Sequence, residues 1–182
     1  MSDSSAAISV DASSRFEDSL PTSSVAMLAM LDDWGVHYAL HTHPPLRTVE
    51  DSQALRGQME GAHIKNLYLR DGKKRNYLVV AEESKAIDLK ELGVAIGAGR
   101  LSFGSADRLM QFLGVRPGAV SPLTLVNDQD QQVQLVMDQS LLDHDKINVH
   151  PLVNDKTITI AKDDLDRIFA KTGHLDTRVL IR

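Results

Sequence analysis

A chain of 182 residues, 42% of them hydrophobic, is long enough to bury one core and has the usual size of a single domain. Its formal charge of −5 argues against a protein that grips long nucleic acid such as DNA through bulk positive charge, although a local basic pocket stays open. The lack of cysteine excludes disulfides, thiolate catalysis and cysteine-ligated zinc, and the sequence has neither a membrane-length apolar run nor a secretory signal, so we expect a cytoplasmic protein.

The chain begins with a segment rich in Ser, Ala and Asp. Its few apolar residues cannot offset the entropy of ordering an isolated segment, so residues 1–22 are predicted to form a flexible tail. The remaining residues, 23–182, contain no internal repeat, and we expect them to form a single domain.

The predicted elements follow from apolar spacing and from cap or turn residues. In chain order they are a helix at 23–35, a strand at 36–43, a helix at 48–57, a hairpin at 64–84, a helix at 87–97, a strand or extended linker at 99–105, a helix at 105–114, a hairpin at 122–138, short strands at 147–155 and 157–160, and a helix at 161–173. Because strands and helices mix through hairpins rather than alternating strictly, the sequence predicts an α+β fold with a mixed, mainly antiparallel sheet.

Four histidines, His37, His41, His43 and His63, lie close together in the sequence. A metal site would need such residues at ligand spacing, but they match neither HExxH nor another paired-ligand pattern. With a period of two, the first three share one strand face, which predicts a solvated face rather than a metal centre. The sequence also has no GxSxG elbow that would mark a nucleophilic serine.

The stretch HIKNLYLRD places Lys65 and Asn66 inside an otherwise apolar strand. Neighbouring strand residues point to opposite faces, so one of the two shares the side of Ile64 and the other the side of Leu67. A lysine on a strand that lines a cleft could hold a phosphate or a carboxylate. The alternative, a lysine that snorkels from an edge strand beside an asparagine in a local hydrogen bond, stays open.

Two further motifs carry candidate chemistry. In GVRPGAVSP, the glycine at Gly118 lets backbone N–H groups approach a ligand, so the loop could stabilise a developing oxyanion, although an ordinary helix-to-strand turn explains it as well. In NVHPLVND, His150 could act as an acid or base or orient a substrate, or it could be a core histidine with satisfied hydrogen bonds.

Six motifs in order, HPP, HIKNLYLRD, GRLSFGS, GVRPGAVSP, LVND and HPLVND, resemble the YbaK-like aminoacyl-tRNA deacylases. This superfamily includes the editing domain of bacterial prolyl-tRNA synthetase, and the chain is most similar to its free-standing alanyl-tRNA(Pro) deacylase branch, over residues 25–172. The resemblance implies a partly barrel-like sheet surrounded by helices. It also implies hydrolysis of alanine wrongly attached to the proline tRNA, with no metal or nucleotide cofactor.

The resemblance assigns roles by motif. Lys65 would hold the phosphate at the terminal adenosine end of the tRNA, Asn66 would support the site, and His150 would line the pocket and position the substrate. The loop backbone would grip the aminoacyl carbonyl and amino group, and its residues are Gly118, Ala119, Val120, Ser121 and Pro122. The tRNA's own ribose hydroxyl would help to align the attacking water, which fits the missing catalytic triad.

The partners implied are the acceptor end of a mischarged tRNA and a prolyl-tRNA synthetase. Because only this end must enter, local positive charge suffices, and the expected residues are Arg47, Arg70, Lys73 and Lys74, of which the last three equally fit a solvated turn. Two alternatives remain: a deacylase for cysteinyl-tRNA(Pro) or seryl-tRNA, and a non-catalytic module that binds a tRNA or a synthetase.

Overall fold

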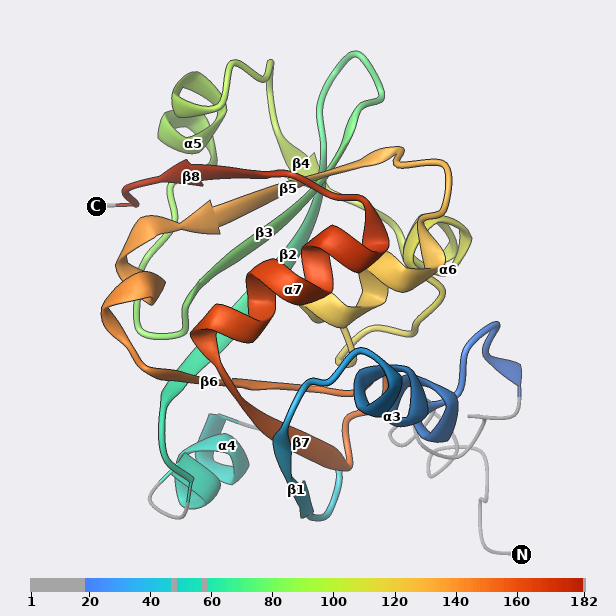
Figure 1. The fold of residues 1–182 in the computed structure, drawn as a ribbon. Helices are drawn as coiled ribbons and strands as arrows, with labels where there is room; N and C mark the ends of the chain where they lie inside the picture. Colours follow the sequence, from blue (N-terminus) through green and yellow to red (C-terminus); the bar gives the residue numbers. More distant parts are fainter. Residues whose placement is uncertain (1–18, 47–48, 57–58, 182) are drawn as a thin grey trace, which may run out of the picture.

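The computed structural model describes residues 19–46, 49–56 and 59–181 (Figure 1). Most of the predicted tail, residues 1–18, lies outside this description. The last four tail residues, 19–22, lie against the domain: Leu20 is buried, and Thr22 donates a hydrogen bond of 2.6 Å to the Oδ1 atom of Asn127. No helix among the described residues is long and apolar enough to cross a membrane.

Eight strands form one mixed sheet in the order β1-β7-β6-β2-β3-β5-β8, with β4 beside β2. They are β1 (Tyr38–Thr42), β2 (Ala62–Arg70), β3 (Asn76–Glu82), β4 (Ser102–Phe103), β5 (Val133–Asp138), β6 (Lys146–Val149), β7 (Lys156–Ala161) and β8 (Asp176–Val179). The pairs β1/β7, β6/β7, β2/β3 and β2/β4 are antiparallel, and the pairs β2/β6, β3/β5 and β5/β8 are parallel. The predicted α+β class with a mixed, mainly antiparallel sheet is confirmed.

The five predicted helices are confirmed, and they are α3 (Ser24–Asp33), α4 (Val49–Arg56), α5 (Leu89–Ala95), α6 (Ala106–Leu113) and α7 (Lys162–Thr172). Local signals define their ends. The Oγ atom of Ser105 accepts a hydrogen bond from the N–H of Arg108 at the start of α6, and Gly114 ends this helix with a left-handed φ of 66°. Gly173 ends α7 in the same way.

The predicted hairpin at residues 122–138 is wrong. A short 3-10 helix, η2 (Pro122–Asn127), forms its first half, and a second one, η3 (Gln139–Asp143), follows β5. Pro122 is the first residue of η2, where its missing N–H costs nothing, whereas in a strand it would interrupt the ladder. The second half is β5, which pairs in parallel with β3 and β8 and therefore depends on contacts distant in sequence.

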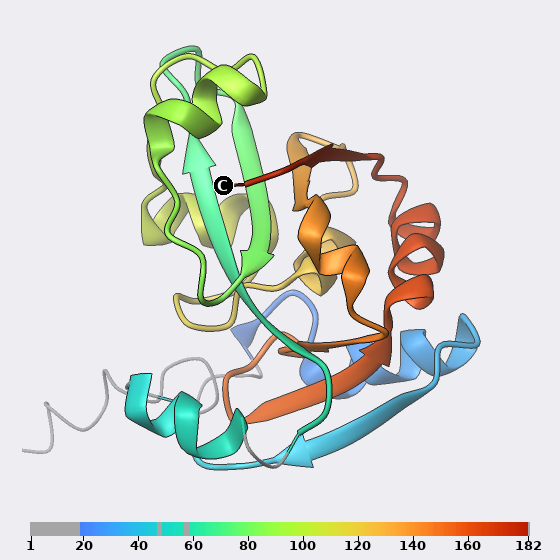
Figure 2. The ribbon, with the colours of Figure 1, turned by 90° about the vertical axis from the view of Figure 1, so that its left-hand side faces the viewer.

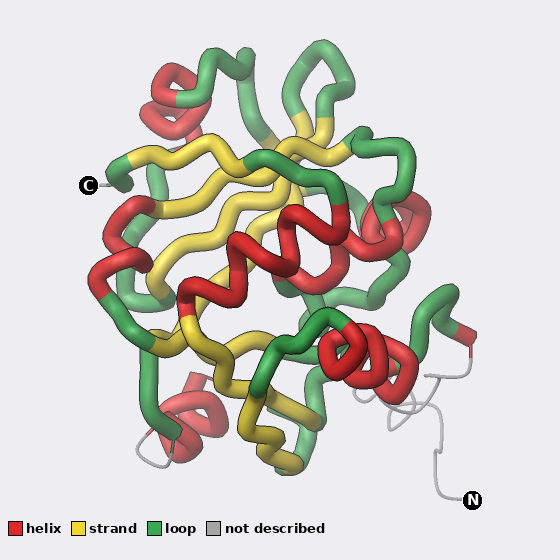
Figure 3. Tube along the Cα trace, in the orientation of Figure 1, coloured by secondary structure: helices red, strands yellow, loops and turns green. Residues whose placement is uncertain are grey.

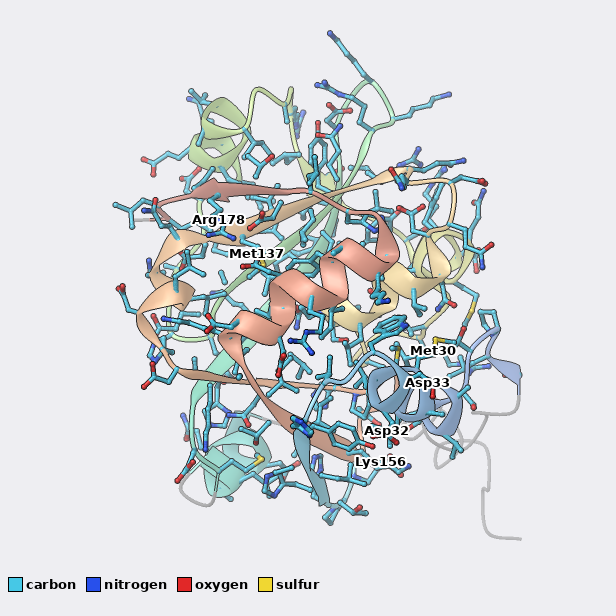
Figure 4. All side chains as sticks on the ribbon, in the orientation of Figure 1. Met30, Asp32, Asp33, Met137, Lys156 and Arg178 are labelled. Carbon is cyan, nitrogen blue, oxygen red and sulfur yellow. The ribbon has the colours of Figure 1, made fainter. Side chains whose placement is uncertain are left out.

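Two apolar clusters lie on opposite faces of the central strands β2 and β3. The larger cluster includes Tyr68 and Val80 and is covered by α3, α6 and α7, the last of which crosses in front of the strands in Figure 3. Met137 of β5 is buried in this cluster, next to α7 in the view of Figure 4. The smaller cluster includes Val79 and Ala81 and packs under α5 (Figure 2). The side chains of β2 are therefore divided between two environments.

Candidate functional site

Lys65 and Asn66 project from opposite faces of β2, as the strand period predicts. In the register with β3, Lys65 lies opposite Ala81 and Asn66 lies opposite Val80. Residues that pair directly across two strands project from the same face. Asn66 therefore faces the larger apolar cluster, and Lys65 faces the smaller one.

This part of β2 has an open edge. Strand β6 pairs with β2 at Ala62 and His63, and β4 pairs with it at Leu69 and Arg70. Within the described chain, residues 64–67 consequently have a strand partner on the β3 side alone, whereas the carbonyl of Tyr68 accepts the N–H of Gly104 just after β4. Lys65 and Asn66 lie in this interval, where a ligand can approach the strand from its side.

The ammonium group of Lys65 donates a hydrogen bond to the backbone carbonyl of Lys85. Lys85 is itself fixed, because its Nζ atom lies 3.2 Å from the buried carboxylate of Asp138 and donates to the carbonyl of Ile181 at 2.5 Å. Burial opposes ionisation of Asp138, but hydrogen bonds from Ser140 and Lys85 outweigh it and hold the pKa of Asp138 below its usual value. The acceptor that positions Lys65 is thus held by a buried ion pair.

The amide oxygen of Asn66 has a different environment. Oδ1 is buried and accepts no hydrogen bond from any described residue. A buried acceptor without a partner costs about 1–3 kcal/mol, so such groups usually have a function or a missing ligand. Asn66 shares its face with Ala119 and Val120, which pack on the larger cluster, so this orphan acceptor and the loop at residues 118–122 lie on the same side of β2.

The loop at residues 118–122 is held from its C-terminal end. The Oγ atom of Ser121 caps η2 by accepting the N–H of that helix's second residue, and Ala119, Ser121 and Pro122 are buried. Gly118 is exposed and has φ +91°, a conformation that favours glycine. The N–H groups of Gly118 and Val120 donate to no atom in the described part of the chain. These two N–H groups are the candidate oxyanion donors, whereas Ser121 and Pro122 support the loop.

His43 contradicts the expectation of a solvated histidine face on the first strand. His37 is exposed and His41 is half-buried near Thr159, but His43 is buried, with 8% of its surface exposed. The chain leaves β1 at this point and folds onto residues 150–155, and the N–H of His43 donates to the carbonyl of Asp155 at 3.0 Å. The expectation was wrong because a tertiary contact covers the end of this strand.

His43 and His150 are linked through Thr157. His150 donates from Nδ1 to the carbonyl of Lys156 at 2.8 Å, and this nitrogen lies 3.4 Å from the Oγ1 atom of Thr157. His43 donates from Nδ1 to the carbonyl of Pro44, so its Nε2 accepts from the hydroxyl of Thr157, each at 2.8 Å. When each imidazole is neutral, this geometry places its proton on Nδ1, and Nε2 of His150 remains as an acceptor.

Burial lowers the pKa of His150, and the neighbouring His43 lowers it further, while the hydrogen bond to the Lys156 carbonyl acts in the opposite direction. Protonation is thus less favourable here than for an ordinary imidazole. The neutral ring, with its acceptor at Nε2, persists below the usual titration range of histidine.

The fall of kcat/KM at acidic pH, the acid limb of the pH profile, tests whether His150 acts as a neutral ring. If neutral His150 positions the substrate, kcat/KM for the hydrolysis implied by the sequence resemblance should stay level down to about pH 6.5 and fall only below it. The rate measured without protein is subtracted at every pH. A His150→Gln variant should be slower and should lose this limb, and a limb at or above pH 6.5 would contradict the proposed protonation state.

The segment that carries His150 also reaches the glycine loop. A Cβ atom added at Gly118 would lie 3.6 Å from the Nδ2 atom of Asn154, and the carbonyl of Asn154 accepts the N–H of Leu46 at 3.4 Å. Residues 150–155 therefore connect the loop at 118–122 with the HPP segment. An open cavity of about 500 Å³ adjoins this segment, and it is lined by Pro44, Pro45, Leu46, Asp51, Ala54 and Leu55.

The structure thus places Asn66 on the same side as the glycine loop, and it places Asn154, from the segment that also carries His150, next to Gly118. Lys65 comes from the opposite face of β2, and Arg47 lies outside the described residues. Sequence reasoning missed His43, Thr157 and Asn154 as site neighbours; the HPP and HPLVND motifs signalled two of them, but nothing in the sequence signalled Thr157. Within the described segments, no three His, Asp or Glu side chains are close enough to hold a metal ion.

Comparison with known proteins gives one consistent result. The model of the aminoacyl-tRNA editing domain family matches residues 43–168. The prolyl-tRNA editing protein ProX of Acetoanaerobium sticklandii is 39% identical over 150 residues, which cover 82% of this chain and 92% of that protein. The prolyl-tRNA synthetase associated domain-containing protein 1 of Mus musculus is 35% identical, over 72% of this chain and 80% of that protein.

Solved structures share the fold at lower identity. The crystal structure of a candidate trans-editing enzyme for prolyl-tRNA synthetase superposes with a TM-score of 0.66 at 17% identity, over 87% of this chain and 98% of that one. The hypothetical protein APE2540 gives a TM-score of 0.65 at 22% identity, over 84% of this chain and 97% of that one. These two structures are therefore matched over 97% and 98% of their length.

Proposed function

The chain belongs to the aminoacyl-tRNA editing domain family and is an aminoacyl-tRNA deacylase, and from this premise we propose that it removes alanine wrongly attached to tRNA(Pro). The assignment of tRNA(Pro) is supported by one relative named as a prolyl-tRNA editing protein and another named for a prolyl-tRNA synthetase associated domain. The choice of alanine rests on the limits of pocket discrimination. A synthetase site built for proline loses only about 1–3 kcal/mol of binding free energy for each methylene that a smaller amino acid lacks, so it also admits alanine. A second, smaller site corrects this error.

The observation that carries the proposal is the orphan Oδ1 atom of Asn66 on the same side of β2 as the loop at 118–122. In the proposed complex, Asn66 accepts a hydrogen bond from the substrate's ammonium group. The free N–H groups of Gly118 and Val120 donate to the ester carbonyl oxygen, whose charge increases in the transition state. One amide oxygen and two backbone N–H groups would thus orient the aminoacyl group.

The proposed reaction needs no strong base from the protein. Water attacks the ester carbonyl carbon, the new C–O bond forms, and the oxyanion rests against the loop N–H groups. The bond to the ribose 3′ oxygen then breaks, and the proton lost by water goes to that oxygen. Nε2 of His150 accepts a hydrogen bond from the water or the ribose hydroxyl, and Lys65 binds a phosphate of the terminal nucleotides by exchanging its contact with the Lys85 carbonyl.

The proposed setting is translation in the cytoplasm, with a mischarged tRNA as substrate and a prolyl-tRNA synthetase as a further partner. A deacylase for cysteinyl-tRNA(Pro) or seryl-tRNA would use the same groups with a pocket of another size. A non-catalytic module would not need the orphan acceptor or the free N–H groups.

Release of the amino acid from a panel of charged tRNAs tests the proposal. Alanyl-, cysteinyl- and prolyl-tRNA(Pro) and seryl-tRNA are incubated with the protein and compared with buffer alone. We expect alanine to be released fastest, and we expect prolyl-tRNA(Pro) to be hydrolysed at least about 100-fold more slowly than alanyl-tRNA(Pro). Faster release of cysteine or serine would reassign the substrate, and no release from any of the four would refute hydrolysis.

A further inference from the structure

Positive charge gathers in two segments of this acidic chain. Residues 70–75 and 100–108 hold six basic residues against two acidic ones, although the whole chain has a formal charge of −5. The basic residues are Arg70, Lys73, Lys74, Arg75, Arg100 and Arg108. A local excess of this kind is typical of a phosphate-binding surface.

The fold brings these segments together. Strand β4 pairs with the end of β2, where Arg70 lies opposite Ser102. The guanidinium of Arg70 lies over the ring of Phe112 in α6, 5.9 Å from its centre, and donates to the carbonyl of Lys74 at 3.0 Å. Burial raises the pKa of Tyr68, the charges of Arg70 and Arg108 lower it, and the charge of Asp128 raises it, so both guanidinium groups act on this phenol.

Of the two acids in these segments, Asp71 is turned inward, and Asp107 forms no ion pair with the basic side chains that the structure describes. Asp71 is buried, accepts the side chain of Arg75 at 2.7 Å, and also accepts the backbone N–H groups of Lys73 and Arg75. Lys73, Lys74 and Arg108 are exposed, and within the described segments none of them has an acidic partner. We call Arg70, Lys73, Lys74 and Arg108 the basic end of the molecule.

We propose that the basic end binds the phosphate backbone of the double-stranded part of the tRNA while its accepting end enters at Lys65 and the glycine loop. This inference rests on the proposed function. Arg70 follows Lys65 by five positions along β2, a span of about 17 Å. Double-stranded RNA is recognised through its phosphates and shape rather than its base edges, which suits exposed lysines and an arginine already oriented by an aromatic ring.

Binding of uncharged tRNA tests the basic end without any catalytic step. Lys73→Glu is compared with Lys171→Glu, which makes the same charge change at an exposed position in the last turn of α7. Lys73→Glu should bind tRNA more weakly than Lys171→Glu and lower the slope of log affinity against log salt by roughly one; the double variant Lys73→Glu/Lys74→Glu should bind on the order of tenfold more weakly and lower the slope by roughly two. Lys171→Glu should match the unaltered protein in both measurements.

A substrate too short to reach the basic end distinguishes RNA binding there from hydrolysis at the candidate site. A short single-stranded oligonucleotide that carries alanine on its 3′ end should be hydrolysed equally by the unaltered protein and the double variant, whereas full-length alanyl-tRNA should show a raised KM in the variant. Equal tRNA affinity and salt slope in all variants would refute the RNA surface. If no charged tRNA is hydrolysed, the proposed function fails, but the binding comparison still decides whether the basic end holds RNA.

Discussion

Replacing Lys65 with alanine is expected to lower kcat/KM for alanyl-tRNA(Pro) on the order of 10² to 10³-fold, the usual effect of removing one well-placed donor from a reacting group or its anchor. The ammonium offers three donors and a full charge to a phosphate, and it lies on the open edge of β2. Single-turnover hydrolysis and the dissociation constant together measure the loss. A phosphate contact should appear mainly in binding, and a contact to the reacting ester mainly in the rate.

The fold should survive this change. Lys65 is half-buried and its hydrogen bond to the Lys85 carbonyl contributes about 1 kcal/mol, so thermal unfolding should shift by only a few degrees. Lys171→Ala serves as the matched control, and Lys65→Gln keeps most of the side-chain volume without its charge. Normal turnover in both Lys65 variants would remove this residue from its assigned role.

The helices could be predicted from sequence because their signals are local. Ser105 and Gly114 lie at the two ends of α6, and a serine cap and a left-handed glycine need only their own helix. Strand β5 could not be paired correctly in this way, because its neighbours β3 and β8 are distant in sequence and parallel to it. Strand β8 was not predicted at all, since it is four residues long and has no fully buried side chain.

In the candidate site, too, local sequence predicted some features, and contacts between distant residues determined the others. The period of a strand predicts that Lys65 and Asn66 face opposite ways, but only the register with β3 shows that Asn66 shares the side of the glycine loop. The period also predicted a solvated His43, and the tertiary contact with Asp155 reversed this. Residue types and spacing identified the groups that carry chemistry, and pairing distant in sequence decided which of them meet.

A large loss of stability is expected from Gly104→Ala, in the GRLSFGS motif beside β2. A Cβ atom at this position would lie 2.2 Å from a carbon of the Tyr68 ring, well inside van der Waals contact. The ring cannot move easily, because Tyr68 is 5% exposed and its hydroxyl donates to Asn76 at 2.7 Å. We expect the free energy of unfolding to fall by about 3 kcal/mol, as overpacking of a rigid core does.

Gly72→Ala is the matched control for this prediction, because nothing lies within 4 Å of the added carbon and the backbone there is not left-handed. Its free energy of unfolding should stay within about 0.5 kcal/mol of the unaltered protein in a urea titration. Equal stability of the two variants would mean that the Tyr68 ring moves aside to make room for the added carbon. Since Tyr68 and Asn66 project from the same face of β2, a ring that yields should also change the binding of the aminoacyl group, and the deacylation rate of Gly104→Ala tests that link.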